Sequence, residues 1–222
     1  MSKYVIILDN GHGVNTPGKC SPDKTLREYA YAREIVGRIA EFFKKTKSYT
    51  VEILVPEATD IGLSIRAQRA NAIYSKYRGK AKVVLISVHC NAAPPNDSKW
   101  HSAMGWAAYT SVGQTESDRV CKNLYDAAEV YLAPYASSFP KGTSQRPIRA
   151  TKNPSKGWEE NFTILKKTNC PAVLTENLFQ DNKYDVDFLL SEGGKKAITN
   201  LHIAGIMKYM EGLSAVPSIT EP

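Results

Sequence analysis

The sequence lacks several features that would place it in a specialised class of protein. No stretch of its 222 residues approaches the roughly 18 consecutive apolar residues of a membrane-spanning helix. Internal repeats and low-complexity segments are also missing, and hydrophobic residues make up 42% of the chain. This length and composition are typical of one globular domain with a sizeable core, and they exclude an integral membrane protein and a disordered chain.

Paired cysteines are missing as well. The four cysteines are spread widely along the chain and form no CxxC motif: Cys20, Cys90, Cys121 and Cys170. In a chain of this size the spacing predicts reduced thiols instead of a disulfide framework.

Charge of one sign is in excess without being concentrated. Lysine and arginine number 29 against 22 aspartates and glutamates, a net charge of +7. The excess suits solubility, or attraction to an anionic polymer such as nucleic acid, a membrane surface or a cell wall. The basic residues form no compact run and no nucleic-acid module is visible, so we expect no nucleic-acid partner.

Short apolar runs alternate with helical patterns, which predicts an α/β fold: a single domain whose mostly parallel, twisted sheet has helices on both faces. We expect strands at Tyr4–Leu8, Val51–Val55, Val83–Val88, Gly105–Thr110 and Ala172–Thr175. We expect helices at Arg27–Lys44, Ser64–Tyr77, Asp118–Leu132 and Gly194–Leu213. In the second helix, Ile65, Ile73 and Tyr77 should face inward.

Two segments, residues 92–104 and 133–161, read as long loops, which in a compact domain are usually functional or mobile. Residues 1–213 are expected to form the domain, and residues 214–222 a disordered tail or the remnant of a linker.

Polar residues follow three of the predicted strands. VIILDNGHG leads to His12, VVLISVHCNA to His89 and PAVLTENLF to Glu176. Ligands of open α/β sheets bind outside the carboxyl ends of the strands, so these side chains are candidates for one shared site. Two imidazoles need a third protein ligand to form a catalytic zinc site. Glu28, in the first turn of the first helix, is the leading candidate, and Asp9 is the second, although Asp9 is better placed to fix a turn.

Each of these residues also has a structural explanation. A single buried histidine is usually a hydrogen-bonded core residue, Glu28 suits a helix N-terminus, and Glu176 suits an ion pair at a strand end. A cysteine–histidine hydrolase using Cys20 or Cys90 is a further alternative. It is weaker, because neither cysteine begins a helix beside an activating base and the Cys90 side chain should face away from that of His89.

Four motifs in order, LDNGHG, LREYAYAREI, SVHCNA and CPAVLTENLF, resemble those of the zinc-dependent N-acetylmuramoyl-L-alanine amidases of the amidase-3 class. These are cell-wall hydrolases found in bacteria and in phage lysins. The resemblance extends from Val5 to about Tyr209. It implies one zinc ion per chain, held by His12, Glu28 and His89, with Glu176 as the catalytic glutamate.

The activity implied by this resemblance is peptidoglycan hydrolysis. Water activated by zinc would cleave the amide between N-acetylmuramic acid and L-alanine of the stem peptide, with Glu176 as general base and acid. We expect a monomer, with Arg149 in the basic segment 141–156 binding carboxylates of the stem peptide. A catalytically silent cell-wall-binding domain, or a zinc carboxypeptidase on the same scaffold, remains as an alternative.

Two positions depart from the family's pattern, and the start of the chain bears on location. Val14 follows GHG where the family usually has glycine, and Leu178 replaces the glycine of Glu-x-Gly-Phe, which predicts a narrower pocket wall. MSKYVIILDNGHG shows no secretory signal. We therefore expect a phage-type lysin or a cytoplasmically stored enzyme that acts on the cell wall, or a secreted or periplasmic enzyme whose signal is not in this sequence.

Overall fold

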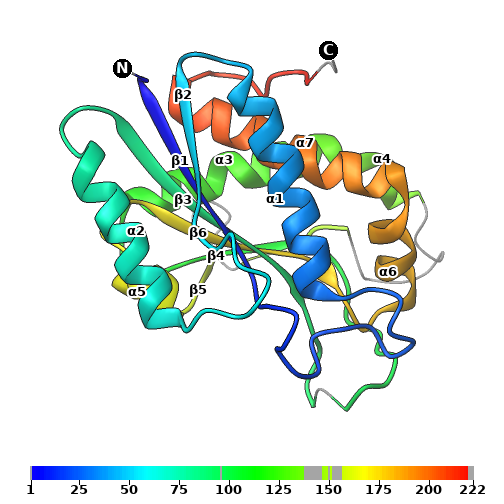
Figure 1. Cartoon of the computed structure of the whole chain (residues 1–222). Coiled ribbons are helices and arrows are strands. Elements are labelled where there is room, and N and C mark those ends of the chain that lie inside the picture. The colour runs from blue at the N-terminus through cyan, green and yellow to red at the C-terminus, as the bar shows by residue number, and fades with distance from the viewer. Residues whose placement is uncertain (1, 96, 138–146, 150, 152–156, 220–222) are drawn as a thin grey trace.

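The computed structural model describes residues 2–95, 97–137, 147–149, 151 and 157–219. Within them, one sheet has the strand order β2-β1-β3-β6-β4-β5 (Figure 1). Its strands are β1 (Tyr4–Asn10), β2 (Tyr49–Ile53), β3 (Lys82–Asn91), β4 (Ala107–Thr110), β5 (Trp158–Glu159) and β6 (Ala172–Phe179). Neighbouring strands are parallel except β4 and β6, which confirms the predicted mostly parallel α/β sheet.

Helices cover both faces of this sheet (Figure 1). One face carries α1 (Glu28–Lys44), α3 (Glu116–Tyr131) and α7 (Glu192–Glu211), and the other carries α2 (Leu63–Tyr77) and α5 (Thr163–Lys167). The short helices α4 (Ala133–Ala136) and α6 (Lys183–Leu190) follow α3 and β6 along the chain. Two apolar cores result, because successive strand residues face opposite sides: Ile6 of β1 lies in the first core and Val5 in the second.

The nine predicted elements are all present, with ends shifted by a few residues, whereas α4, α5, α6 and β5 were not predicted. These four are too short to show a clear periodicity in sequence. Within α2 the expected inward position of Ile65 is wrong, since this side chain is half exposed. The helix instead presents Ala67 and Ala70 to the sheet, because small side chains permit close approach.

The pairing of β3 with β6 contains an irregularity next to the candidate site. His89 pairs with Glu176, but the next paired residues are Asn91 and Phe179, so β6 has one more residue than β3 there. Leu178 lies in this bulge with a φ of 63°, a left-handed conformation that a glycine adopts without strain. Its side chain is fully buried in the first core, so the predicted narrowing of a pocket wall by Leu178 is wrong.

The segment after α7 contacts the domain as far as it is described. The hydroxyl of Tyr131 donates to the carbonyl oxygen of Pro217 and accepts from the backbone N–H of Ile219. Val216 and Ile219 also pack against the first core. Residues 216–219 therefore contact the end of α3 and the first core, and the division of the chain at residue 213 stays a prediction.

Two expectations about chemistry and membranes can be compared with the fold. All four cysteines are free thiols, as predicted from their spacing. None of the helices in the described ranges combines the length and the apolar character that crossing a bilayer requires.

His202 of α7 is buried against β6 as a neutral imidazole. Its Nδ1 lies 2.7 Å from the carbonyl oxygen of Ile198, which only a donor suits, so Nε2 accepts from the Thr175 hydroxyl at 2.9 Å. Burial lowers the pKa of His202 to about 4. This histidine therefore belongs to the core and not to the candidate site.

Protonation of His202 should make the folded state sensitive to acid. Below pH 6.5 the His202 side chain is protonated in the unfolded chain but stays neutral in the folded chain until the pH nears 4. The free energy of unfolding therefore falls as pH drops, by roughly 3 kcal/mol at pH 4. A glutamine keeps a donor and an acceptor without titrating, so His202→Gln should lose less stability between pH 7 and pH 4. Urea unfolding at both pH values measures this. Equal losses in the two proteins would show that His202 does not titrate on unfolding.

Candidate active site

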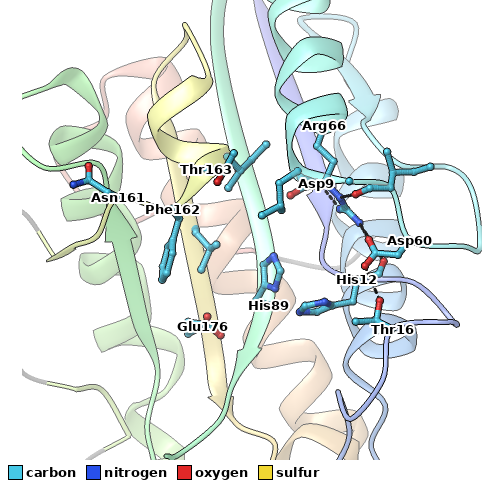
Figure 2. Close-up of a pocket in the computed structure, with 15 residues that line it drawn as sticks. Asp9, His12, Thr16, Asp60, Arg66, His89, Asn161, Phe162, Thr163 and Glu176 are labelled. Atoms are coloured by element: carbon cyan, nitrogen blue, oxygen red, sulfur yellow. Dashed lines mark hydrogen bonds and ion pairs between the residues drawn. The ribbon is translucent and has the colours of Figure 1, made fainter.

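The carboxyl ends of three adjacent strands meet at one edge of the sheet and bring the predicted residues together (Figure 2). His12 follows β1, His89 lies near the end of β3, and Glu176 is its paired residue on β6. Glu28 belongs to a helix instead of a strand, as the first residue of α1. Its backbone N–H donates to the carbonyl oxygen of Lys19, which ties the start of α1 to the preceding loop.

The buried carboxylate of Glu28 lies between the two imidazoles. Its Oε1 is 3.3 Å from Nε2 of His12 and 3.0 Å from Nδ1 of His89, and it accepts a hydrogen bond from the backbone N–H of Cys90. The two rings are edge to face, with centroids 5.0 Å apart. Oε2 of Glu28 is buried and has no hydrogen-bond partner within the described ranges, which leaves a charged oxygen available to a cation.

This set of donor atoms fits a zinc ion. One atom from each of His12, Glu28 and His89 lies within 4.8 Å of the others, and no second group of this kind occurs in the described part of the chain. Tetrahedral ligands with bonds near 2.1 Å are about 3.4 Å apart, close to the separations seen here. Two imidazoles and one carboxylate also match the ligands of catalytic zinc sites that keep a fourth position for water.

The pKa values reflect the burial and the mutual contacts of these groups. Burial raises the pKa of Glu28, but its contacts with His12 and His89 outweigh burial and hold that pKa well below the usual range. Burial lowers the pKa of His89 and Glu28 raises it, with a net upward shift. Burial raises the pKa of Glu176 to about 7, against the opposing charges of His89 and Lys19.

The glycines on either side of His12 are required by close approach. A Cβ on Gly11 would lie 2.4 Å from the His89 ring, and one on Gly13 would lie 2.0 Å from the backbone nitrogen of Asp60. His12 itself has a φ of 60°, in the left-handed region. The glycines on both sides of His12 therefore leave the space in which its imidazole can turn toward His89.

Two arginines hold this strained turn in place. Arg33 of α1 and Arg66 of α2 donate to the carbonyl oxygen of His12 at 3.0 and 3.3 Å. Arg66 also forms ion pairs with Asp9 at 2.6 Å and Asp60 at 2.8 Å (Figure 2). The sequence suggested neither role for these arginines, because their partners are distant in sequence. The other oxygen of Asp9 accepts from Ser87, so this second candidate ligand is occupied in fixing the loop.

Two cavities open on the candidate site, and His12, His89 and Glu176 line both of them. The larger, of about 570 Å³, has a mostly apolar wall to which Leu63 and Phe162 contribute. Figure 2 shows Phe162 on the Glu176 side of this cavity. The smaller, of about 370 Å³, lies against residues 90–95 and the loop before α1. A bound molecule could therefore extend on both sides of the two histidines.

Arg149 lies apart from the candidate ligands. Its guanidinium contacts the rings of Trp158 and Phe179, with centroid distances of 5.1 and 5.2 Å, and it lines neither cavity. Most of the basic segment 141–156 is outside the described residues. The binding role predicted for Arg149 stays a prediction.

The cysteine-based alternative gains no support from this geometry. Cys90 belongs to the first apolar core, as its alternation with His89 predicted, and burial raises the pKa of its thiol well above the usual range. Cys20 lines neither cavity. Neither cysteine is therefore placed to act as a thiolate nucleophile.

Two comparisons of the sequence find related proteins. The sequence profile of the N-acetylmuramoyl-L-alanine amidase family matches residues 6–208. The endolysin of Bacillus phage SPP1 is 28% identical over 213 residues, which cover 95% of this chain and 67% of that protein.

Solved structures show the same fold. An N-acetylmuramoyl-L-alanine amidase from Clostridium difficile 630 has a TM-score of 0.76 and 23% identity, covering 95% of this chain and 98% of that one. The catalytic domain of the amidase CwlV from Bacillus (Paenibacillus) polymyxa var. colistinus has a TM-score of 0.68 and 21% identity, covering 95% and 99%.

A methyl group at residue 11 should weaken metal binding without removing any ligand. In Gly11→Ala the added Cβ would displace the His89 ring, so we expect zinc affinity to fall by about 10- to 100-fold, as when a supporting contact of a ligand is lost. Competition with a chromophoric chelator measures the affinity. Gly37→Ala, which adds a Cβ in open space within α1, is the matched control and should bind zinc like the wild type. Unchanged affinity in a folded Gly11→Ala would contradict the placement of His89.

Proposed function

This chain belongs to the N-acetylmuramoyl-L-alanine amidase family, and from that premise we propose how its own residues perform the reaction. The reaction of the family is hydrolysis of the amide that joins the lactyl group of N-acetylmuramic acid to L-alanine of the peptidoglycan stem peptide. Because an amide carbonyl is a poor electrophile and water a poor nucleophile at neutral pH, the site must activate both.

In this proposal His12, Glu28 and His89 hold one zinc ion per chain. The observation that carries it is the convergence of their three donor atoms within 4.8 Å of one another, beside the buried Oε2 of Glu28, which has no partner in the described residues. When bound, zinc supplies the Lewis acidity that polarises the scissile carbonyl and makes water a stronger acid. The chain's contribution is to fix the three ligands, through the GHG turn and the two arginines on the carbonyl oxygen of His12.

Glu176 is proposed as the proton carrier. Its carboxylate takes a proton from the attacking water and passes it to the leaving nitrogen of L-alanine. Three observations support this role: Glu176 is the paired neighbour of His89, it lines both cavities, and its Oε2 is buried without a hydrogen-bond partner in the described ranges. A carboxyl group with a pKa raised to about 7 can both accept and donate a proton near neutral pH.

We also propose the setting in which this chemistry occurs. The chain would act as a monomer on the cell wall, in the manner of the similar phage endolysin, with residues 1–213 as its catalytic domain. A secreted or periplasmic enzyme would use the same site. Arg149, which stacks on two aromatic rings near the end of β6, would bind a carboxylate of the stem peptide.

Glu176→Gln and His12→Ala should separate the proton carrier from the metal ligands. We expect Glu176→Gln to keep its zinc and lose about 10²- to 10⁴-fold in turnover, whereas His12→Ala should lose zinc as well as activity. Zinc content and digestion of purified peptidoglycan measure the two effects. The wild type should release stem peptides with a free amino group on L-alanine and create no new reducing sugar ends.

Other products would identify the alternatives. Single amino acids released from the ends of stem peptides would indicate a carboxypeptidase, and the absence of any product from the zinc-loaded wild type would indicate a silent binding domain. Wild-type turnover in Glu176→Gln would remove Glu176 from the mechanism.

Arg149→Ala distinguishes binding from packing at a position that the sequence singled out. If its guanidinium binds substrate, KM should rise several-fold while kcat and Tm stay close to the wild-type values. Steady-state kinetics on soluble muropeptides, together with thermal unfolding, provide the measurement. A lower Tm with unchanged KM would mean that Arg149 serves only to pack against Trp158 and Phe179.

A further inference from the structure

Lys19 lies in the loop between β1 and α1, next to the groups that would perform the reaction. Its backbone carbonyl oxygen accepts from the N–H of Glu28, so the loop is anchored at this residue. The side chain is half-buried and lines the smaller cavity, which His12, His89 and Glu176 also line. The backbone of Lys19 is therefore fixed beside the candidate site, and its side chain extends along the smaller cavity.

Its ammonium group is available to a ligand. Two permanent cations line the two cavities, Arg66 in the larger and Lys19 in the smaller. The Arg66 guanidinium is occupied by ion pairs with Asp9 and Asp60. Across the described ranges, no hydrogen bond or ion pair engages the Lys19 ammonium. Its charge acts on the nearby Glu176 carboxyl group without a direct contact. A half-buried positive charge that no hydrogen bond or ion pair engages in the described residues suits an anion brought by the bound molecule.

The chemistry of the substrate indicates which of its groups would bind the Lys19 ammonium. This step rests on the proposed function, which places the scissile amide at the three residues shared by the two cavities. On the glycan side the carboxyl group of muramic acid is consumed in that amide, so this side brings no charge near the reaction. On the peptide side, the acidic residue that follows L-alanine brings the nearest carboxylate, which is free in some stem peptides and amidated in others.

We propose that Lys19 determines specificity by binding the carboxylate of the stem-peptide residue that follows L-alanine. The peptide then lies in the smaller cavity, beside Lys19 and residues 90–95. The uncharged muramoyl side lies in the larger cavity, where Leu63 and Phe162 provide an apolar wall. The enzyme thus prefers stem peptides in which this carboxylate is free over those in which it is amidated.

A pair of soluble substrates tests this directly. The test compares two muramoyl pentapeptides. They differ only at the residue after L-alanine, which carries a free carboxylate in one peptide and the corresponding amide in the other. The zinc-loaded wild type should show a kcat/KM about 10- to 100-fold higher on the carboxylate form, as expected for one charge-assisted hydrogen bond. Lys19→Met should lose this preference by slowing only on the carboxylate form, and Lys19→Arg should keep most of it.

The matched control is Lys24→Met, which removes the same charge from an exposed position of the same loop that lines neither cavity. It should retain the full preference. Equal kcat/KM values of the wild type on the two substrates would overturn the inference. So would an equal loss on both substrates in a folded, zinc-loaded Lys19→Met, because Lys19 would then act on Glu176 instead of on substrate. If the zinc-loaded wild type cleaved neither substrate, the proposed function itself would fail, and this inference with it.

Discussion

The carboxylate of Glu28 imposes the constraint on which the site depends. It is buried almost completely at the start of α1, and a charge in that position is stable only where positive or polar groups surround it. Two imidazoles and one backbone N–H contact its Oε1. Its Oε2 has no partner in the described residues and remains available to a cation. A metal ion bound here would therefore also add local stability, since it would compensate the charge that burial makes unfavourable.

The loop that carries His12 shows how much of the molecule is used to position one ligand. Its left-handed backbone is held by arginines from two helices on opposite faces of the sheet, so α1 and α2 both act on the same carbonyl oxygen. Arg66 is itself fixed by Asp9 and Asp60. A buried ion pair of this kind is favourable only when its remaining donors are satisfied, and here Arg66 also donates to the backbone carbonyl oxygens of Ile61 and Asn10. These contacts fix the geometry of the candidate metal site more than they add net stability.

The two cavities differ in character although they share the same three reactive side chains. One is walled largely by apolar residues and the other is lined by the cationic side chain of Lys19, which is the basis for proposing one direction of substrate binding. The loop before α1 contributes both to the candidate site and to the smaller cavity, because the segment that supplies Lys19 also fixes the backbone of Glu28. In the proposed function, ligand placement and substrate choice would both depend on this one short stretch of chain.

The sequence by itself determined the alternation of strands and helices and the residues at the ends of β1, β3 and β6, because both follow from local periodicity and from the rule that parallel strands end at the same edge. The sequence could not show that Arg33 and Arg66 donate to the carbonyl oxygen of His12, because they lie 21 and 54 residues from it in the chain. Nor could it show that Leu178 is buried in the core and that Ile65 is half exposed. Those outcomes depend on the distances at which helices pack on the sheet and on a bulge in strand pairing. Only the tertiary structure decides them, since a long side chain reaches whatever the packing of distant segments brings within its length.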